Sequence, residues 1–136
     1  IRQANKRRAI FRHLHHYYPT HIAVLQETHS SPRDQAYWQA EWGAPVFLSH
    51  GANTSVCGVA VLLPRSLLGV CDVRMIHSHA DGRLLILELI FEQFTLTLVA
   101  VYAPTQGHMQ QQLSFNIYHS WIHRSLDFQK HNQLKF

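Results

Sequence analysis

The segment that most constrains the fold is residues 82–104, GRLLILELIFEQFTLTLVAVYAP, which is apolar over most of its length. A polar break at Glu92 divides it, and the second half alternates Phe94, Leu96 and Leu98 with threonines before becoming wholly apolar. Alternation with a period of two indicates a β-strand with one buried face, and a polar break between two such runs indicates a turn. We therefore expect a β-hairpin in which Phe94, Leu96 and Leu98 face the core.

The residues before this hairpin predict helices and strands in alternation. Apolar residues spaced three and four apart indicate helices, and short apolar runs between turn-forming residues indicate strands. The predicted elements are a helix over 5–18 that ends at Pro19, a strand over 21–26, a helix over 32–42, strands over 45–50 and 58–63, and a strand over 69–77. The run HIAVLQ (21–26) predicts a strand covered on both faces. This order is typical of an α/β layer structure.

Beyond Pro104 the composition becomes more polar, and one more element is predicted. Leu113, Ile117 and Trp121 recur every four residues, which indicates an amphipathic helix within residues 105–126. The final ten residues hold only scattered apolar side chains. We treat residues 1–136 as a single domain, because 46% hydrophobic residues suffice for one globular core.

Charge and cysteine content limit the partner and the compartment. Twelve Lys and Arg against eight Asp and Glu give a net charge of +4, and four of the basic residues fall within the first eight positions. This balance suits a polyanion such as DNA, although such a run can also be a solvated helix start. Cys57 and Cys71 show no C-x-x-C spacing and are expected to be reduced thiols, which favours an intracellular location, the nucleus included. No apolar run reaches the ~18 residues of a membrane span.

The twelve histidines raise the question of a metal cluster. His13 and His16 share one face of the first predicted helix. Structural zinc sites need three or four ligands, commonly with cysteines or paired histidines at fixed spacing. No such set is completed in this sequence, so we do not expect a structural zinc site.

An acid ends the first predicted strand. Glu27 follows the apolar run IAVLQ directly, and a hydroxyl and an imidazole, His29, come next. By itself such an acid is either solvated or a ligand for a cation. It belongs, however, to an ordered series: LQETH at a strand end, GVAVLL after a polar loop, DGRLLILEL opening a hairpin, and VAVYAP closing it. This series resembles the endonuclease/exonuclease/phosphatase superfamily, and most of all the apurinic-type endonuclease domains of non-LTR (LINE-type) retrotransposons.

The resemblance runs from KRRAIFRHL to the helix after YAP and implies a fold, a metal and a site. The fold would be an α/β, DNase I-like four-layer sandwich, here a partial domain over residues 1–136 that holds roughly its N-terminal half. The activity would be Mg²⁺-dependent cleavage of DNA phosphodiesters. The resemblance implies that Glu27 binds Mg²⁺, that Tyr102 lies near the scissile phosphate, and that His29 lies close to the DNA. Without it, Tyr102 could equally be a core tyrosine, Glu27 a solvated acid and His29 a loop residue.

Several family motifs are missing from the sequence. Members carry an N-x-N-G strand before the first helix, and G-D-F-N and S-D-H motifs after the YAP segment; none of these occurs here. By resemblance those residues hold and activate the attacking water, and losing parts of a catalytic unit typically lowers the rate by about 10⁴ to 10⁶. We expect little or no nuclease activity from this chain. The alternatives are an inactive nucleic-acid-binding protein that uses its basic helix, or a branch acting on phosphoinositides, nucleotides or sphingolipids.

The same truncation bears on stability. If the second sheet were absent, roughly ten apolar side chains would lose their cover, a loss of ~15 to 30 kcal/mol against the ~5 to 15 kcal/mol by which domains are stable. We would then expect an oligomer or a partner to cover the exposed sheet face.

Overall fold

The computed structural model describes residues 3–103, so the helix expected within 105–126 lies outside the described residues. The elements are α1 Ala4–Tyr17, β1 Ala23–Gln26, α2 Asp34–Trp42, β2 Val46–Ser49, β3 Val59–Leu62, the 3-10 helix η1 Arg65–Leu67, β4 Asp72–Ser78, β5 Leu84–Ile90 and β6 Thr95–Val101. Each helix and strand predicted within 3–103 is confirmed, with shifted ends. The second helix begins at Asp34 instead of residue 32, because the Asp34 carboxylate accepts hydrogen bonds from the backbone N–H and the hydroxyl of Ser31.

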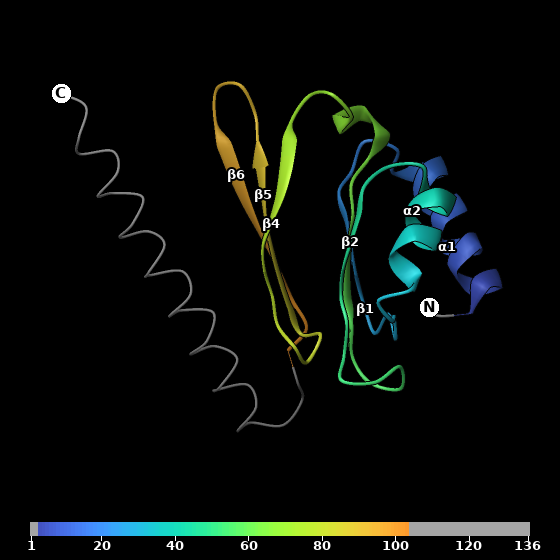
Figure 1. Cartoon of the computed structure of the whole chain (residues 1–136). Helices are drawn as coiled ribbons and strands as arrows, with labels where there is room; N and C mark the ends of the chain where they lie inside the picture. The colour runs from blue at the N-terminus through green and yellow to red at the C-terminus, as the bar shows by residue number, and fades with distance from the viewer. Residues whose placement is uncertain (1–2, 104–136) are drawn as a thin grey trace, which may run out of the picture. The chain divides into compact units, whose positions relative to one another are not determined.

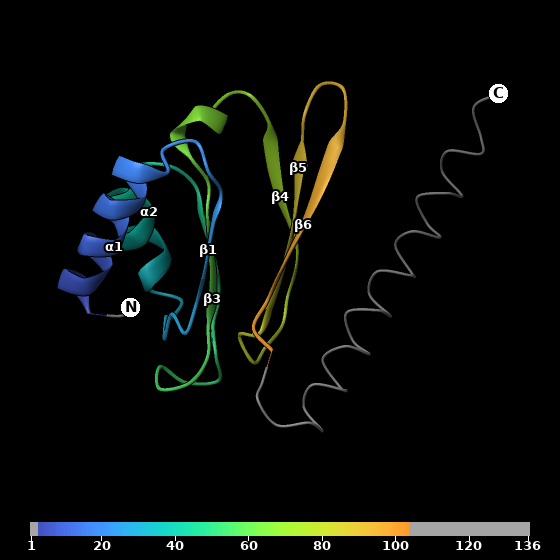
Figure 2. The same cartoon turned by 180° about the vertical axis from the view of Figure 1, so that it is seen from behind.

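The strands form two antiparallel sheets of three strands each, in the orders β1-β3-β2 and β4-β5-β6. Both α-helices cover the outer face of the first sheet, and the second sheet faces its other side (Figures 1 and 2). The described residues thus supply a helix layer and two sheet layers, which confirms a mixed α/β fold. A fourth layer on the outer face of the second sheet is not formed by residues 3–103.

Aromatic side chains fill the space between the helices and the first sheet. Trp38 and Trp42, four residues apart on α2, are buried, as their spacing predicts. Phe11 of α1 meets both indoles edge-on, with ring centroids 6.0 and 5.2 Å away. Trp42 also donates its Nε1–H to the carbonyl of Leu63 at 2.6 Å, so this buried polar group is satisfied.

The inner faces of the two sheets bury each other, so the second sheet is present among the described residues. The buried residues of this core are Val59, Val61, Leu63, Leu85, Leu87, Leu89 and Ala100. Two expectations were wrong at its margins. Val24 is 43% exposed because β1 is an edge strand, so HIAVLQ is not covered on both faces. Of the three residues expected to face the core, Leu98 packs there, whereas Phe94 and Leu96 are 59% and 43% exposed.

Strand length explains the exposed end of the hairpin. β5 and β6 are seven residues long, whereas the strands of the first sheet are four. The turn end of the hairpin therefore extends beyond the facing sheet, and Phe94 stacks on Phe91 with ring centroids 4.6 Å apart.

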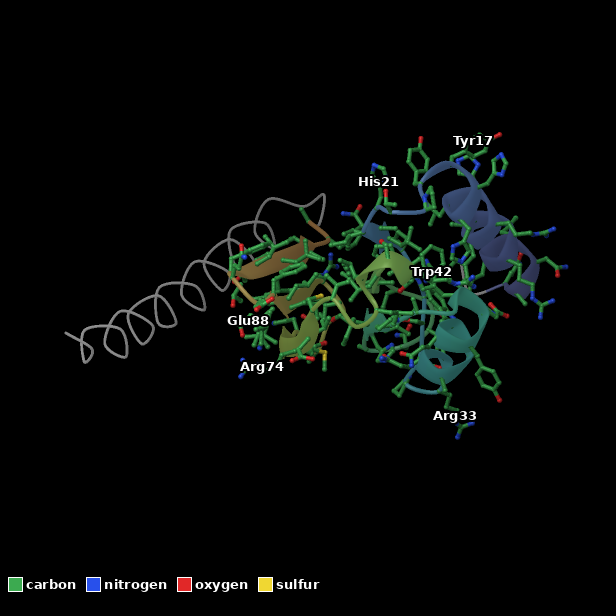
Figure 3. All side chains as sticks on the ribbon, turned by 90° about the horizontal axis from the view of Figure 1, so that it is seen from above. Tyr17, His21, Arg33, Trp42, Arg74 and Glu88 are labelled. Atoms are coloured by element: carbon green, nitrogen blue, oxygen red, sulfur yellow. The ribbon has the colours of Figure 1, made fainter. Side chains whose placement is uncertain are left out.

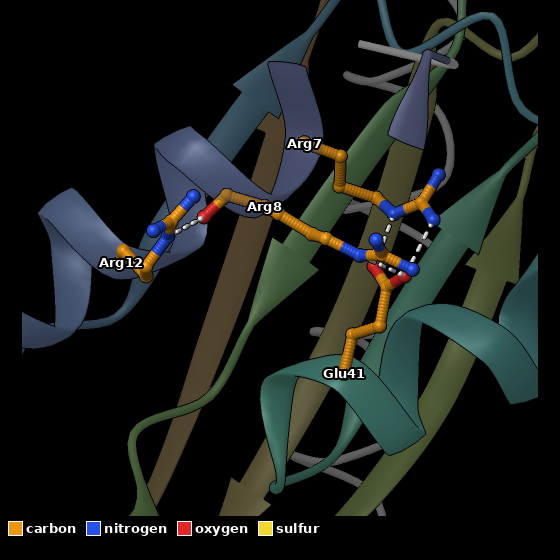
Figure 4. A network of polar contacts seen from close by, with 4 residues as sticks. All are labelled: Arg7, Arg8, Arg12 and Glu41. Carbon is orange, nitrogen blue, oxygen red and sulfur yellow. Dashed lines mark hydrogen bonds and ion pairs between the residues drawn. The ribbon is translucent and has the colours of Figure 1, made fainter. Parts of the chain in front are cut away.

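An ion pair joins the two helices (Figure 4). The guanidinium of Arg7, which is buried, donates to both carboxylate oxygens of Glu41, at 2.5 and 2.8 Å. Arg8 reaches the same carboxylate at 3.3 Å from a largely exposed position. These contacts raise the pKa of Arg7 and lower the pKa of Glu41. Part of the basic run at the N-terminus is thus structural.

Two further expectations concern the cysteines and membrane-spanning helices within residues 3–103. Cys57 and Cys71 are both free thiols in this structure. Neither helix in this part of the chain is long and apolar enough to cross a membrane.

Candidate functional site

Four segments that are distant in sequence meet at one end of the two sheets, the lower end in Figure 1. The loop after β1 is joined to the residues before β3 by the hydrogen bond from Thr28 N–H to the Gly58 carbonyl, 3.2 Å. Gly58 N–H in turn donates to the Gly82 carbonyl at 3.1 Å, and Tyr102 N–H donates to the Arg83 carbonyl at 2.8 Å. These bonds bring the end of the first sheet next to the end of the second.

The three residues to which the resemblance pointed are brought together at this end. His29 Nε2 lies 2.9 Å from Glu27 Oε2, a contact that is an ion pair when the imidazole is protonated. The phenol of Tyr102 donates a hydrogen bond to the Glu27 carboxylate. That hydrogen bond is the main cause of the raised pKa of Tyr102, and partial burial and the negative charge of Glu27 add to it. Glu27 thus sits between an imidazole and a neutral phenol.

The backbone that presents Glu27 and His29 is strained. Both residues are left-handed, with φ of 53° and 51°, a region that residues other than glycine enter at a cost of about 1–3 kcal/mol each. The residue between them, Thr28, is fully buried. The carboxylate and the imidazole lie on either side of Thr28 in sequence and meet in space. Strain of this kind is often concentrated at functional sites.

Gly58 allows the close approach of the two strands at this loop. Its φ of +104° is unfavourable for other residues, and a Cβ there would lie 2.2 Å from Thr28 Oγ1. The glycine of GVAVLL is therefore required by packing against the loop that carries Glu27.

A chain of polar groups, buried at Thr28 and Ser30, anchors the same loop. The hydroxyls of Thr28 and Ser30 lie 3.1 Å apart, and Ser30 Oγ lies 3.0 Å from His50 Nδ1. Burial lowers the pKa of His50, and the negative charge of Asp34 partly offsets this shift. Since Ser30 is buried, we interpret this chain as support for the loop and not as a nucleophile.

Arg83 is a member of the site that the sequence analysis did not single out. Its guanidinium lies over the ring of Tyr102, 5.4 Å from the centroid, and its NH1 atom is buried without a hydrogen-bond partner among the described residues. The position of Arg83 beside Tyr102 follows from the register of the hairpin. A turn centred on Glu92 and Gln93 pairs Leu84 with Val101, which places the next residue outward, Arg83, opposite Tyr102.

The donor set at this end can be compared with the needs of Mg²⁺. This ion takes oxygen ligands, keeps several waters and is commonly held by one or two carboxylates together with a substrate phosphate. The Glu27 side chain is 48% exposed and can supply one carboxylate. No group of three His, Cys, Asp or Glu able to hold a metal occurs within residues 3–103. The site therefore fits an ion held by Glu27, water and phosphate, and does not fit a metal enclosed by protein ligands.

Comparison with known proteins points to a transposon protein. No protein-family model matches the chain. The chain is 41% identical over 86 residues to the Transposon TX1 uncharacterized 149 kDa protein of Xenopus laevis. The match covers 63% of this chain but 6% of the transposon protein, so the chain corresponds to a small part of that relative's length. This similarity supports a relationship to a transposon protein.

Proposed function

We propose that this chain carries the metal- and phosphate-binding part of a Mg²⁺-dependent phosphodiesterase site that acts on DNA, in a domain of DNase I-like architecture. The observation that carries the proposal is that Glu27 and His29, on a strained loop, meet Tyr102 at one end of the two sheets. The similarity to a transposon protein and the net charge of +4 support a nucleic-acid substrate.

In this proposal Glu27 is the protein ligand of Mg²⁺. The ion, when bound, would polarise a phosphoryl oxygen and stabilise the leaving alkoxide. His29, in contact with the carboxylate, would orient it and contact the DNA backbone.

Tyr102 and Arg83 would contact the phosphate. The phenol of Tyr102 has one proton to donate, and we propose that it turns from the Glu27 carboxylate to a phosphate oxygen when Glu27 binds the metal. The guanidinium of Arg83 lies over the same ring and supplies positive charge beside it. Because the sequence contains neither G-D-F-N nor S-D-H, we assign no residue to activation of the attacking water and expect slow or undetectable turnover.

The affinity of the purified chain for a 20-base-pair DNA duplex, with and without Mg²⁺, tests the proposal. The wild-type chain should bind more tightly with Mg²⁺ than the Glu27→Gln variant does at the same Mg²⁺ concentration, whereas the two should bind alike in EDTA. Glu92→Gln, which removes an exposed acid at the hairpin turn, is the matched control and should behave as wild type. An identical response to Mg²⁺ in all three proteins would refute the proposal.

A further inference from the structure

A second surface, at the other end of β1 from Glu27, combines positive charge with exposed rings. We call it the α1 surface and define it by seven residues of α1 and the turn that follows: Lys6, Arg12, His13, His16, Tyr17, Tyr18 and His21. All seven are exposed, and Tyr17 and Tyr18 are 62% and 47% exposed. Figure 3 shows Tyr17 and His21 projecting from the same edge of the protein.

The rings of this surface form a continuous row. Tyr17 contacts His16 and His13, with ring centroids 4.5 and 4.7 Å apart. His13 approaches Tyr18 at 6.1 Å, and Tyr18 meets His21 at 5.5 Å. Rings held against one another present their faces and edges to solvent in a fixed arrangement, which lowers the entropy lost when a flat ligand stacks on them.

The charge beside the rings is positive. α1 contains no Asp or Glu, and the nearby Glu41 of α2 is engaged by Arg7 and Arg8. Lys6 and Arg12 remain on the exposed side of the helix, where Arg12 Nε donates to the Arg8 carbonyl at 3.4 Å (Figure 4). A polyanion is the complementary partner for such a helix face.

The α1 surface is separate from the candidate phosphodiesterase site. His21 precedes β1 and Glu27 follows it, so the two lie at opposite ends of a strand, roughly 15–20 Å apart at ~3.3 Å per residue. A ligand on the α1 surface would therefore leave the loop that carries Glu27 accessible.

We propose that the α1 surface binds a single-stranded nucleic acid, with Tyr17 and Tyr18 stacking on unpaired bases and Lys6 and Arg12 contacting the backbone phosphates. Alternating aromatic and cationic groups are the usual means of holding single strands without sequence preference. A duplex hides the faces of its bases and offers these rings nothing to stack on. A membrane surface suits the site less, because the aliphatic residues of α1, Ile10 and Leu14, are packed against the core and cannot insert.

The test uses the full chain in EDTA, so that Mg²⁺-dependent binding near Glu27 does not contribute. The probes are a 20-nucleotide oligothymidine strand, a 20-base-pair duplex, and vesicles that contain phosphatidylserine. The paired substitution Tyr17→Ala and Tyr18→Ala should weaken binding to the strand by ~10-fold or more. The matched control, Tyr37→Ala, removes a tyrosine on α2 that is 68% exposed and should leave binding unchanged. Tyr17→Phe with Tyr18→Phe keeps the rings and should retain binding.

The roles of Lys6 and Arg12 can be tested through the salt dependence of binding. The paired substitution Lys6→Gln and Arg12→Gln should lower the slope of log affinity against log salt for the strand by ~1.4, since each phosphate contact on a single strand contributes ~0.7. Addition of the strand to the wild-type chain should also shift the amide NMR signals of residues 13–21 and spare those of residues 27–29, a measurement that needs no variant. Unchanged strand affinity in the Tyr→Ala pair, NMR shifts confined to residues 27–29, or tighter binding to vesicles than to the strand would each overturn the proposal.

Discussion

The phenol of Tyr102 donates a hydrogen bond to the carboxylate of Glu27, although the two residues follow strands of different sheets. This bond requires both sheets to be in place, because Glu27 follows β1 and Tyr102 follows β6. It also links the residue proposed to hold the metal with the residue proposed to contact the phosphate.

The first prediction concerns the ionisation of Tyr102. Its pKa should lie above the ordinary value of about 10, and Glu27→Gln should bring it down, because the hydrogen bond to a charged acceptor and the neighbouring negative charge are lost. A raised pKa means that this contribution to stability is complete below pH ~10 and is lost as the pH rises through the folded-state pKa. Titration of the tyrosine Cζ signals by ¹³C NMR measures it. Glu88→Gln should leave Tyr102 unchanged, and an equal pKa in wild type and Glu27→Gln would contradict the hydrogen bond.

Replacement of Gly58 tests the packing beneath the loop. Gly58→Ala places a Cβ against Thr28 Oγ1 at a φ of +104°, so we expect a loss of about 3 kcal/mol or more in the free energy of unfolding. The same variant should displace Glu27 and lower the pKa of Tyr102. Gly69→Ala is a suitable control, since its φ of +72° is also left-handed but a Cβ there meets nothing within 4 Å. Equal losses in the two variants would show that backbone strain alone, and not contact with Thr28, explains the effect.

The Arg7–Glu41 pair predicts a large loss of stability when the Glu41 carboxylate is replaced. Glu41→Gln should lower the free energy of unfolding by about 2–4 kcal/mol, because it removes the negative charge that accepts two hydrogen bonds from the buried guanidinium of Arg7. Glu88→Gln breaks a pair with Arg74, whose side chain is 65% exposed and 3.6 Å away, and should cost about 0–1 kcal/mol. Chemical denaturation of both variants makes the comparison. Similar losses at the two positions would contradict a structural role for the basic run.

His50 predicts a dependence of stability on pH. Its pKa is lowered by burial, so between pH 6.5 and the lower folded-state pKa the unfolded chain binds more protons than the native one. The stabilising contribution is therefore present above pH 6.5 and is lost as the pH falls through the folded-state pKa. Denaturation at a series of pH values from 7.5 to 5 should show that the free energy of unfolding falls less in His50→Gln than in wild type. Parallel curves would mean that His50 is not the group responsible.

Parts of this structure were accessible from the sequence and parts were not. The hairpin turn at Glu92 fixes which residues pair, and the register that follows also places Arg83 opposite Tyr102. By contrast, the left-handed backbone of Glu27 and His29 has no periodic signal, because it depends on bonds to residues 57–58. These bonds join the loop to the residues that precede β3, the strand that pairs with β1.

Burial at the sheet margins could not be predicted from the sequence either. An apolar run predicts a strand but not the length of the strands that face it. Val24 is exposed because β1 lies at an edge, and Leu96 because its seven-residue strand extends beyond four-residue strands. Glu27, His29 and Tyr102, to which the resemblance pointed, lie next to one another, and their roles stay a prediction.

The most direct test of the central claim is to locate the metal. Mn²⁺ added to the ¹⁵N-labelled chain broadens the amide signals of residues near its binding site. The account predicts that the signals of Thr28, His29, Gly58 and Tyr102 broaden first in the wild type and stay sharp in Glu27→Gln at the same Mn²⁺ concentration. Broadening that centres on other acids, such as Asp72 or Glu92, or that persists unchanged in Glu27→Gln, would contradict the assignment of Glu27 as the metal ligand.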